Sequence, residues 1–529
     1  MTTAAPTATA PPRPPAWPLA VLFGLLLLPV VVLLARQLVA GLPEIAVGSD
    51  PAVIELATVD AARGRQLLGP YSRFGFHHPG PAMFYVLLPG YLLGGRTHGG
   101  LLLGALLVNL LALASIAVAA TRLGERRLTV AVLVLLPLLV LRIGPAGLSS
   151  AWNPNLVVPA FVLTVVSAVA VAAGERALLP VLVAAGSFAA QSHLGLVAPV
   201  VTVFAVTAAA RLVTRLRRSL DHSPDRPRSH WPTTVAVAVA VVMWAPVAIE
   251  QLSADGPGNV SRIVAFVTQP RTPQPLGAVV TAYGGAAGSW LTAALAPAGG
   301  GTTAVVLGLA LALVQPAVLA LAVRRRRWLL VAVSALGLAL VPVALVSLRA
   351  VAGPLHEYLT RWIAGLGLIH GVAMTAALLP RRLDGAGDAT RTRGPVLAPI
   401  VAVAVLVAGV SLVRVTAYPS WREQAASPVF ARIGRATTAA SACAADGPVH
   451  VWVGGGTSWE LAAGIVLRLA KDGRAVSVDP EWAFMFGSRR AGAVEGARLL
   501  VCEAGPTCVA GETVWQEEGT RVAVLPNPG

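Results

Sequence analysis

The sequence predicts a polytopic α-helical membrane protein that ends in an α/β domain outside the cytoplasm. Hydrophobic residues make up 56% of the 529 residues and charged residues only 12%, whereas a soluble domain typically carries about 25% charged residues. The apolar residues gather in runs that reach the roughly 20 residues a bilayer requires. The net charge of +16 does not indicate nucleic-acid binding, because the arginines stand in short clusters between the apolar runs.

Eleven apolar runs are predicted to be spans, of which the fifth is short enough to be tilted or re-entrant. They cover residues 17–40, 101–121, 128–148, 155–173, 179–192, 194–213, 233–250, 302–323, 328–348, 359–379 and 395–414. Two more apolar stretches, 82–95 and 277–297, are short or glycine-rich, and we expect them to lie at the membrane surface.

The arginines orient these spans. With eleven spans, 19 arginines fall in cytoplasmic segments and nine in the outer loops, which predicts a cytoplasmic N-terminus in a plasma (inner) membrane. Residues 1–16 are then a disordered cytoplasmic tail, 17–414 the membrane domain and 415–529 the extracytoplasmic domain.

The tail alternates predicted strands and helices. Strands are expected at 449–453 and 475–478, a helix at 459–471, and further strands near 498–502, 513–515 and 522–525. The turn VGGGTSWE either binds a phosphate at the helix N-terminus or is an ordinary turn capped by Thr457 or Ser458. Cys502 and Cys508 are close enough in sequence for a disulfide, and this pairing is left open.

The first outer loop, 41–100, concentrates polar and aromatic groups that a simple connection would not need. Asp50 followed by Pro51 predicts a helix start with Asp50 as N-cap, and this helix is expected to run to about Leu68. A break at Gly69 follows, and then a second short helix over 82–95. The segment between the two surface helices contains the candidate site residues Tyr71, Arg73, His77 and His78.

This loop resembles the first periplasmic loop of the GT-C superfamily of membrane glycosyltransferases, in the branch of the protein O-mannosyltransferases, aminoarabinose transferases and Rgt-type enzymes. Ser49-Asp50 stands where that family has an acidic residue after its first span, and HHPGPAMFYVLLPGYLLGG stands where it has an aromatic segment and a second surface helix. The resemblance covers about 50 residues well. It implies an enzyme that transfers a sugar from a polyprenyl-phosphate donor to a cell-envelope acceptor.

The resemblance also implies roles for individual residues. Asp50 would deprotonate the acceptor or help to hold a divalent metal ion, and Tyr71 would contact substrate. Charge on the departing phosphate would be neutralised by Arg73, His77, His78 and Arg361.

The sequence departs from the family pattern at two points. A family acidic doublet is Asp50-Pro51 here, so that Glu55 and Asp60 are the nearest further carboxylates, and His77-His78 replaces a Glu-Lys pair. Metal dependence is therefore in question.

Structural roles compete with these catalytic roles. Asp50 could only cap its helix, His77 and His78 could be interfacial, Arg361 could snorkel at a span end, and His193 could mark a break between spans. Two other functions therefore stay open, a non-catalytic envelope scaffold of the same fold and a transporter or flippase of lipid-linked substrates.

Overall fold

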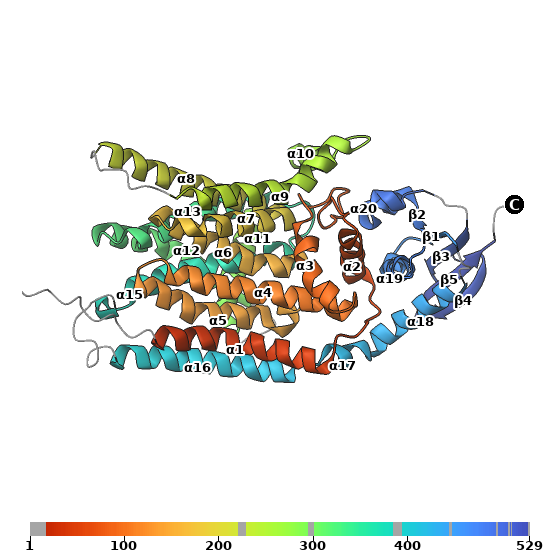
Figure 1. The fold of residues 1–529 in the computed structure, drawn as a ribbon, viewed down its shortest axis with the longest axis horizontal. Helices are drawn as coiled ribbons and strands as arrows, with labels where there is room; N and C mark the ends of the chain where they lie inside the picture. Colours follow the sequence, from red (N-terminus) through yellow and green to blue (C-terminus); the bar gives the residue numbers. More distant parts are fainter. Residues whose placement is uncertain are drawn as a thin grey trace, which may run out of the picture.

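The structure is a computed structural model that describes residues 17–220, 229–294, 301–383, 394–443, 447–492, 496–505, 508 and 510–526. The predicted disordered tail, 1–16, lies outside the described residues. A long bundle of helices carries a smaller α/β domain at one end, and both belong to one continuous molecule (Figure 1). We refer to the end of the bundle that carries this domain as the domain end.

Within the described residues, nine helices are long and apolar enough to cross a membrane. Each coincides with one of the predicted spans, so the prediction of a multi-pass membrane protein is confirmed. They are α1 (Trp17–Ala40), α4 (His98–Thr121), α5 (Arg126–Leu148), α6 (Asn153–Ala173), α8 (Val197–Leu220), α9 (Trp231–Ser253), α12 (Gly301–Arg324), α13 (Trp328–Arg349) and α16 (Gly394–Ala417).

The two remaining predicted spans are shorter helices of the same bundle. They are α7 (Leu179–Ser192), which packs between α6 and α9, and α15 (Ile363–Leu378), which packs against α5, α11 and α12. The turns η1 (Arg176–Leu178), η2 (Leu194–Leu196) and η3 (Arg381–Leu383) adjoin these helices.

Helix α11 (Leu276–Thr292) corrects the expectation of a surface segment at 277–297. It is inserted into the bundle, where Tyr283 and Trp290 are buried. Gly284 and Gly288 allow this close packing, because a Cβ on Gly288 would lie 2.7 Å from the backbone nitrogen of Gly308 on α12. The glycines that suggest a surface loop in the sequence are thus a helix–helix contact.

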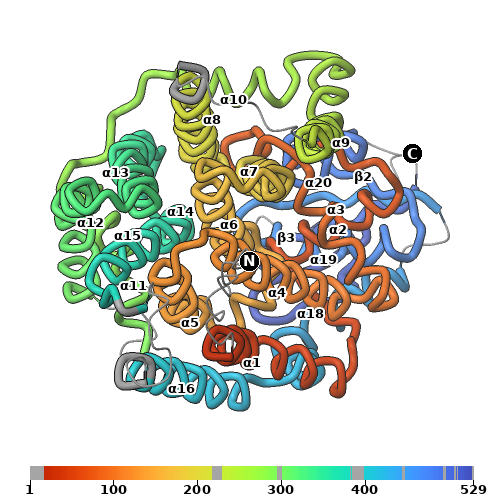
Figure 2. Tube along the Cα trace, turned by 60° about the vertical axis from the view of Figure 1, so that its left-hand side comes forward, coloured from red at the N-terminus to blue at the C-terminus, as the bar shows by residue number. Residues whose placement is uncertain are grey.

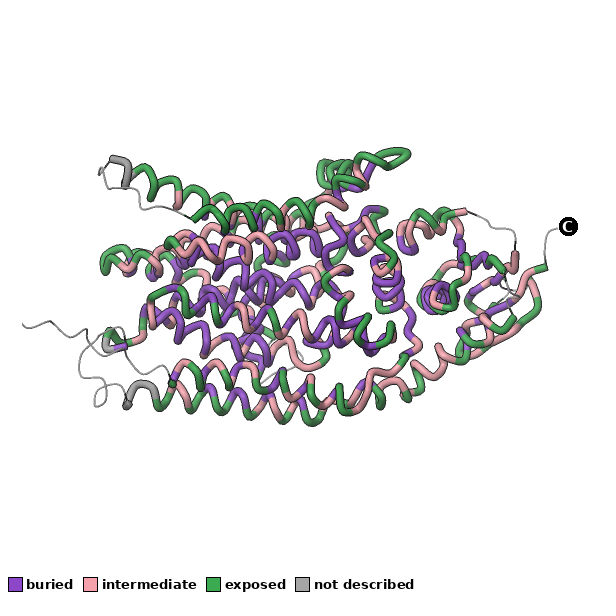
Figure 3. Tube along the Cα trace, viewed as in Figure 1, coloured by how far each residue is buried: buried purple, intermediate pink, exposed green. Residues whose placement is uncertain are grey.

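Helix α6 is at the centre of the bundle (Figure 2). It begins at Asn153 with Pro154 in its first turn and ends at Gly174, whose φ of 115° is left-handed. Almost all of its side chains are buried, whereas α8, α9 and α16 expose apolar side chains along the outside of the bundle (Figure 3). This exposed apolar belt is what contact with lipid requires.

The first loop forms two helices at the domain end, α2 (Ser49–Ala62) and α3 (Ala82–Leu93). Helix α2 ends six residues before the predicted Leu68, because Gly64 turns the chain with a φ of 67° and its N–H bonds to the Ala61 carbonyl. The second loop at this end, residues 254–275 between α9 and α11, forms α10 (Asn259–Thr268). The short α14 (Glu357–Thr360) precedes α15.

The α/β domain has a five-stranded sheet with the order β2-β1-β3-β5-β4. Strand β1 pairs in parallel with β2 and β3, while β5 pairs antiparallel with β3 and β4. The strands are β1 (Val449–Val453), β2 (Val476–Val478), β3 (Ala497–Glu503), β4 (Glu512–Glu517) and β5 (Thr520–Leu525), and the helices and turns are α17 (Trp421–Ala425), α18 (Pro428–Cys443), α19 (Ser458–Lys471), η4 (Pro480–Trp482), α20 (Ala483–Phe486) and η5 (Ser488–Arg490). Cys502 and Cys508 form a disulfide within it.

Candidate functional site

A large cavity lies at the domain end, between the bundle and the α/β domain. Its volume is about 1630 Å³. The wall combines the first loop, the second loop with α10, the chain before α15, and the α/β-domain segment 480–490. Seven of the nine candidate site residues line it, and they are Asp50, Asp60, Tyr71, Arg73, His77, His78 and His193.

Asp50 is held by a tyrosine and not by a helix cap. Gly48 is the N-cap of α2 and Ser49 its first residue, so the expectation that Asp50 caps this helix is wrong. Ser49 has a left-handed φ of 53°, and the Asp50 carboxylate accepts a hydrogen bond from the Tyr71 hydroxyl. Burial and the adjacent carboxylate raise the pKa of Tyr71, so its phenol stays protonated and donates. Asp50 is therefore a carboxylate oriented by Tyr71 in the cavity wall.

The segment that contains the histidines is a tight hairpin stabilised from the second loop. Tyr71 and His77 form an isolated antiparallel bridge, and the Ser72 N–H donates to the Phe76 carbonyl at 2.9 Å. The Asn259 side chain accepts from the His77 N–H at 2.8 Å and donates to the His77 carbonyl at 3.0 Å. No pattern in the sequence indicates this role for Asn259.

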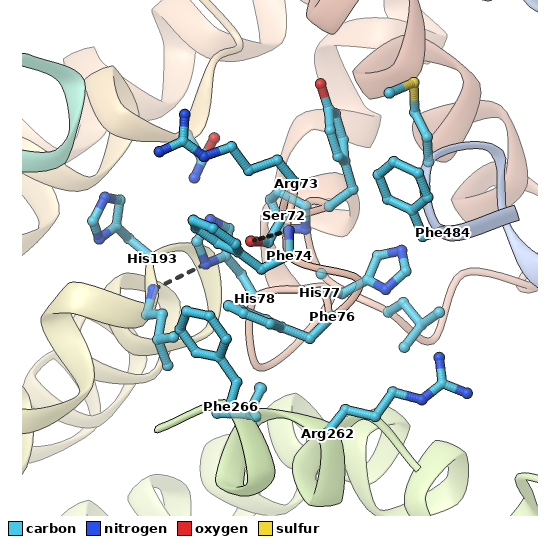
Figure 4. Close-up of a pocket in the computed structure, with 18 of the residues that line it drawn as sticks. Ser72, Arg73, Phe74, Phe76, His77, His78, His193, Arg262, Phe266 and Phe484 are labelled. Atoms are coloured by element: carbon cyan, nitrogen blue, oxygen red, sulfur yellow. Dashed lines mark hydrogen bonds between the residues drawn. The ribbon is translucent and has the colours of Figure 1, made fainter. Parts of the chain in front are cut away.

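Arg73 is exposed at the tip of this hairpin and only loosely held. Its guanidinium is 3.4 Å from both the Ala352 carbonyl and the His356 ring, and it lies over the Phe74 ring at 5.0 Å. Figure 4 shows Arg73 and Phe74 beside the histidines, with Phe266 facing Phe74 and Phe76. A second cation, Arg271, covers Phe266 at 4.1 Å.

His77 is buried, His78 is half-buried, and both rings are neutral. Burial and the nearby Arg262 charge lower the pKa of His77 to about 4, although the Phe484 carbonyl opposes this shift. Burial and then the charges of its histidine neighbours lower the pKa of His78 well below the usual value. At neutral pH these rings can offer hydrogen bonds to a phosphate but no charge, so the charge-neutralising role expected of them does not hold at this pH.

Arg361 lies apart from this group. It does not line the cavity, although its neighbours Leu359 and Trp362 do. Its guanidinium donates to the Asn155 side chain at 2.6 Å and lies 3.7 Å from the Glu357 carboxylate. Arg361 is thus already paired.

Glu55 and Asp60, the next carboxylates after Asp50 in the sequence, form ion pairs with the α/β domain. Glu55 is fully buried and bonds to His98 and to Lys471 of α19, at 2.7 Å each. Burial alone would raise the pKa of Glu55, but His98 and Lys471 lower it, so this carboxyl is ionised. Asp60 makes a bidentate pair with Arg490 at 2.7 and 2.9 Å.

The glycine-rich turn of the α/β domain already holds a carboxylate. Glu503 accepts from the Thr457 N–H at 2.7 Å and from its hydroxyl at 2.9 Å. A phosphate at this turn would have to displace the Glu503 carboxylate. The interpretation as an ordinary turn before a helix therefore fits better.

The divalent metal ion implied by the resemblance has no ready set of ligand side chains in the described part of the chain. Among the described residues, no three His, Cys, Asp or Glu side chains gather closely enough to hold an ion. Asp50 lines the cavity with the Tyr71 hydroxyl as its hydrogen-bond partner. We therefore derive no step through a metal.

Comparison with known proteins identifies the fold. No protein-family model and no curated protein sequence matches the chain. Among solved structures, the chain is similar to the crystal structure of ArnT from Cupriavidus metallidurans in the apo state, with a TM-score of 0.55 and 14% identity over 96% of this chain and 98% of that one. The chain therefore has an ArnT-like membrane fold with a C-terminal sheet domain.

Proposed function

We propose that this protein is a membrane glycosyltransferase that moves a sugar from a polyprenyl-phosphate donor to a cell-envelope acceptor. The observation that carries the proposal is the Asp50 carboxylate, oriented by Tyr71 in a cavity of about 1630 Å³ at the domain end of a GT-C fold. The protein O-mannosyltransferase, aminoarabinose-transferase and Rgt-type enzymes are the branch that its first loop resembles.

The chemistry is a displacement at the anomeric carbon of the sugar. Asp50 accepts the proton of the acceptor hydroxyl as its oxygen forms the new glycosidic bond. The bond between the anomeric carbon and the phosphate oxygen breaks, and the polyprenyl phosphate leaves with the electron pair. Arg73, exposed and loosely held, stabilises the charge on that phosphate.

The proposed topology places this reaction outside the cytoplasm. A cytoplasmic N-terminus in the plasma (inner) membrane puts the domain end, the cavity and the α/β domain on the outer side. The donor's lipid chain would then lie against the exposed apolar faces of the bundle while its phosphate stays near the interface.

The test is sugar transfer by full-length protein in nanodiscs, with labelled polyprenyl-phosphate mannose, arabinose and galactose and an envelope lipid extract as acceptor. We expect Asp50→Asn to lower transfer by about 10²–10⁴-fold. Glu481→Gln is the matched control, because Glu481 is an exposed carboxylate in the same cavity wall, and it should transfer like wild type. Equal rates for Asp50→Asn and wild type would show that Asp50 is not the catalytic base. Donor binding without any transfer would favour the non-catalytic scaffold.

A further inference from the structure

Two histidines from distant parts of the chain stack in the cavity wall. His78 follows the hairpin of the first loop, and His193 lies between α7 and η2. Their ring centroids are 5.5 Å apart and their planes differ by only 15°. Both rings line the cavity, and Figure 4 shows them beside Phe74.

Backbone hydrogen bonds determine which ring nitrogen carries the proton. The Nδ1 atom of His78 accepts the Leu194 N–H at 3.0 Å, and Nδ1 of His193 accepts the Gly195 N–H at 3.1 Å. A nitrogen that accepts an N–H must keep its lone pair, so each neutral ring carries its proton on Nε2. Protonation of either Nδ1 would break its backbone bond.

The two Nε2–H groups are therefore donors without a partner in the described part of the chain, on rings that line the cavity. Trp362 adds an aromatic surface beside them, since a Cβ on Gly195 would lie 3.6 Å from its indole nitrogen. Neutral N–H donors next to aromatic faces suit an uncharged, hydroxyl-rich ligand. The cation Arg73 is at the exposed tip of the hairpin, five residues before His78, and Arg271 belongs to the second loop.

We propose that His78 and His193 bind the sugar of the lipid-linked donor, by donating from their Nε2 atoms to its hydroxyl oxygens. This inference rests on the proposed function and deepens it, because it separates a neutral sugar subsite from the cationic phosphate subsite around Arg73. It also gives His78 a hydrogen-bonding role in place of a charge-neutralising one.

The test compares binding of farnesyl phosphate with binding of its mannosyl, arabinosyl and galactosyl esters to full-length protein in nanodiscs. Asn at either position keeps an oxygen near the place of Nδ1 and removes the Nε2 donor, whereas Gln keeps a donor near Nε2. We expect His78→Asn and His193→Asn to weaken the preferred sugar ester by about 10-fold each and to leave farnesyl phosphate unchanged. His193→Gln should recover most of the loss.

Three outcomes would overturn the proposal. These are equal weakening of the ester and of farnesyl phosphate, no weakening of either, or a wild type that prefers none of the three esters to farnesyl phosphate. Binding is measured without turnover, so sugar preference with no transfer would contradict the enzyme proposal while leaving this subsite supported.

Discussion

The ammonium of Lys471 lies 2.7 Å from the Glu55 carboxylate, which is fully buried under the α/β domain. The same ammonium also bonds to Glu44 at 2.7 Å, and His98 bonds to Glu55 from the start of α4. Lys471 therefore joins α19 of the α/β domain to the loop that contains Asp50.

We predict that Lys471→Met destabilises the protein by about 3–5 kcal/mol, because it leaves the Glu55 charge buried without its cation. Thermal unfolding and limited proteolysis of the α/β domain would measure this. Arg468→Met is the control, since Arg468 pairs with Asp472 at the surface and its replacement should cost under about 0.5 kcal/mol. Adding Glu55→Gln to Lys471→Met should recover part of the loss, and no recovery would show that the ion pair is not the cause.

Tyr71→Phe should lower transfer by about 10-fold through kcat with little change in KM. The reason is that the hydroxyl of Tyr71 orients Asp50 but is already engaged by it. Steady-state kinetics of Tyr71→Phe beside Asp50→Asn would measure this difference. A loss as large as that of Asp50→Asn would mean that Tyr71 acts directly on substrate.

Acidification should destabilise the protein through His77. Its pKa is about 4 in the folded state against 6.5 in an unfolded chain, so between these values the unfolded state binds more protons and stability falls as the pH drops. The penalty reaches about 2 kcal/mol at pH 5 and is absent above pH 7. The unfolding midpoint of His77→Gln should fall less than that of wild type between pH 7 and 5, and equal falls would contradict this assignment.

Arg73→Gln should weaken farnesyl phosphate binding by about 10-fold, because an exposed and loosely held guanidinium is available to an anion. Arg361→Gln is the comparison, since Arg361 is already paired with Asn155 and lies outside the cavity wall. It should change this affinity by less than about 2-fold. Isothermal titration of both variants with farnesyl phosphate measures these affinities. A larger loss in Arg361→Gln than in Arg73→Gln would place the phosphate subsite at Arg361.

Cys443 provides a test of orientation. It is exposed at the end of α18, while the other two cysteines form the disulfide. A membrane-impermeant maleimide should label it in intact cells if the α/β domain is extracytoplasmic. Thr121 is exposed at the end of α4 that is farther from the α/β domain. In a Cys443→Ser background, Thr121→Cys should react with the maleimide only after permeabilisation. The opposite pattern would reverse the topology.

Features that depend on local sequence were predicted well. Strand β1 has the bounds expected for it, Val449–Val453, because alternating valines between turns specify a strand locally. The spans could be predicted from length and hydropathy alone. Burial of α11 in the bundle could not, because its glycines contact α12 and the sequence does not identify that partner.

The candidate site depends on contacts between distant residues. Asp50 and Tyr71 are 21 residues apart in the sequence. His78 bonds to Leu194, 116 residues away, and Lys471 bonds to Glu55, 416 residues away. No periodic pattern encodes such pairs. Lys471 was conspicuous as the single lysine of the chain, yet only the fold shows that it pairs with Glu55.

The first and last spans, α1 and α16, pack side by side, and Gln37 accepts a hydrogen bond at 2.8 Å from the Trp421 N–H, 384 residues later. Because a ribosome makes α1 long before α16, α1 is in place before the helix that packs against it has been made. The wall built from residues 480–490 comes later still. Chains that end before this segment therefore lack part of the cavity wall.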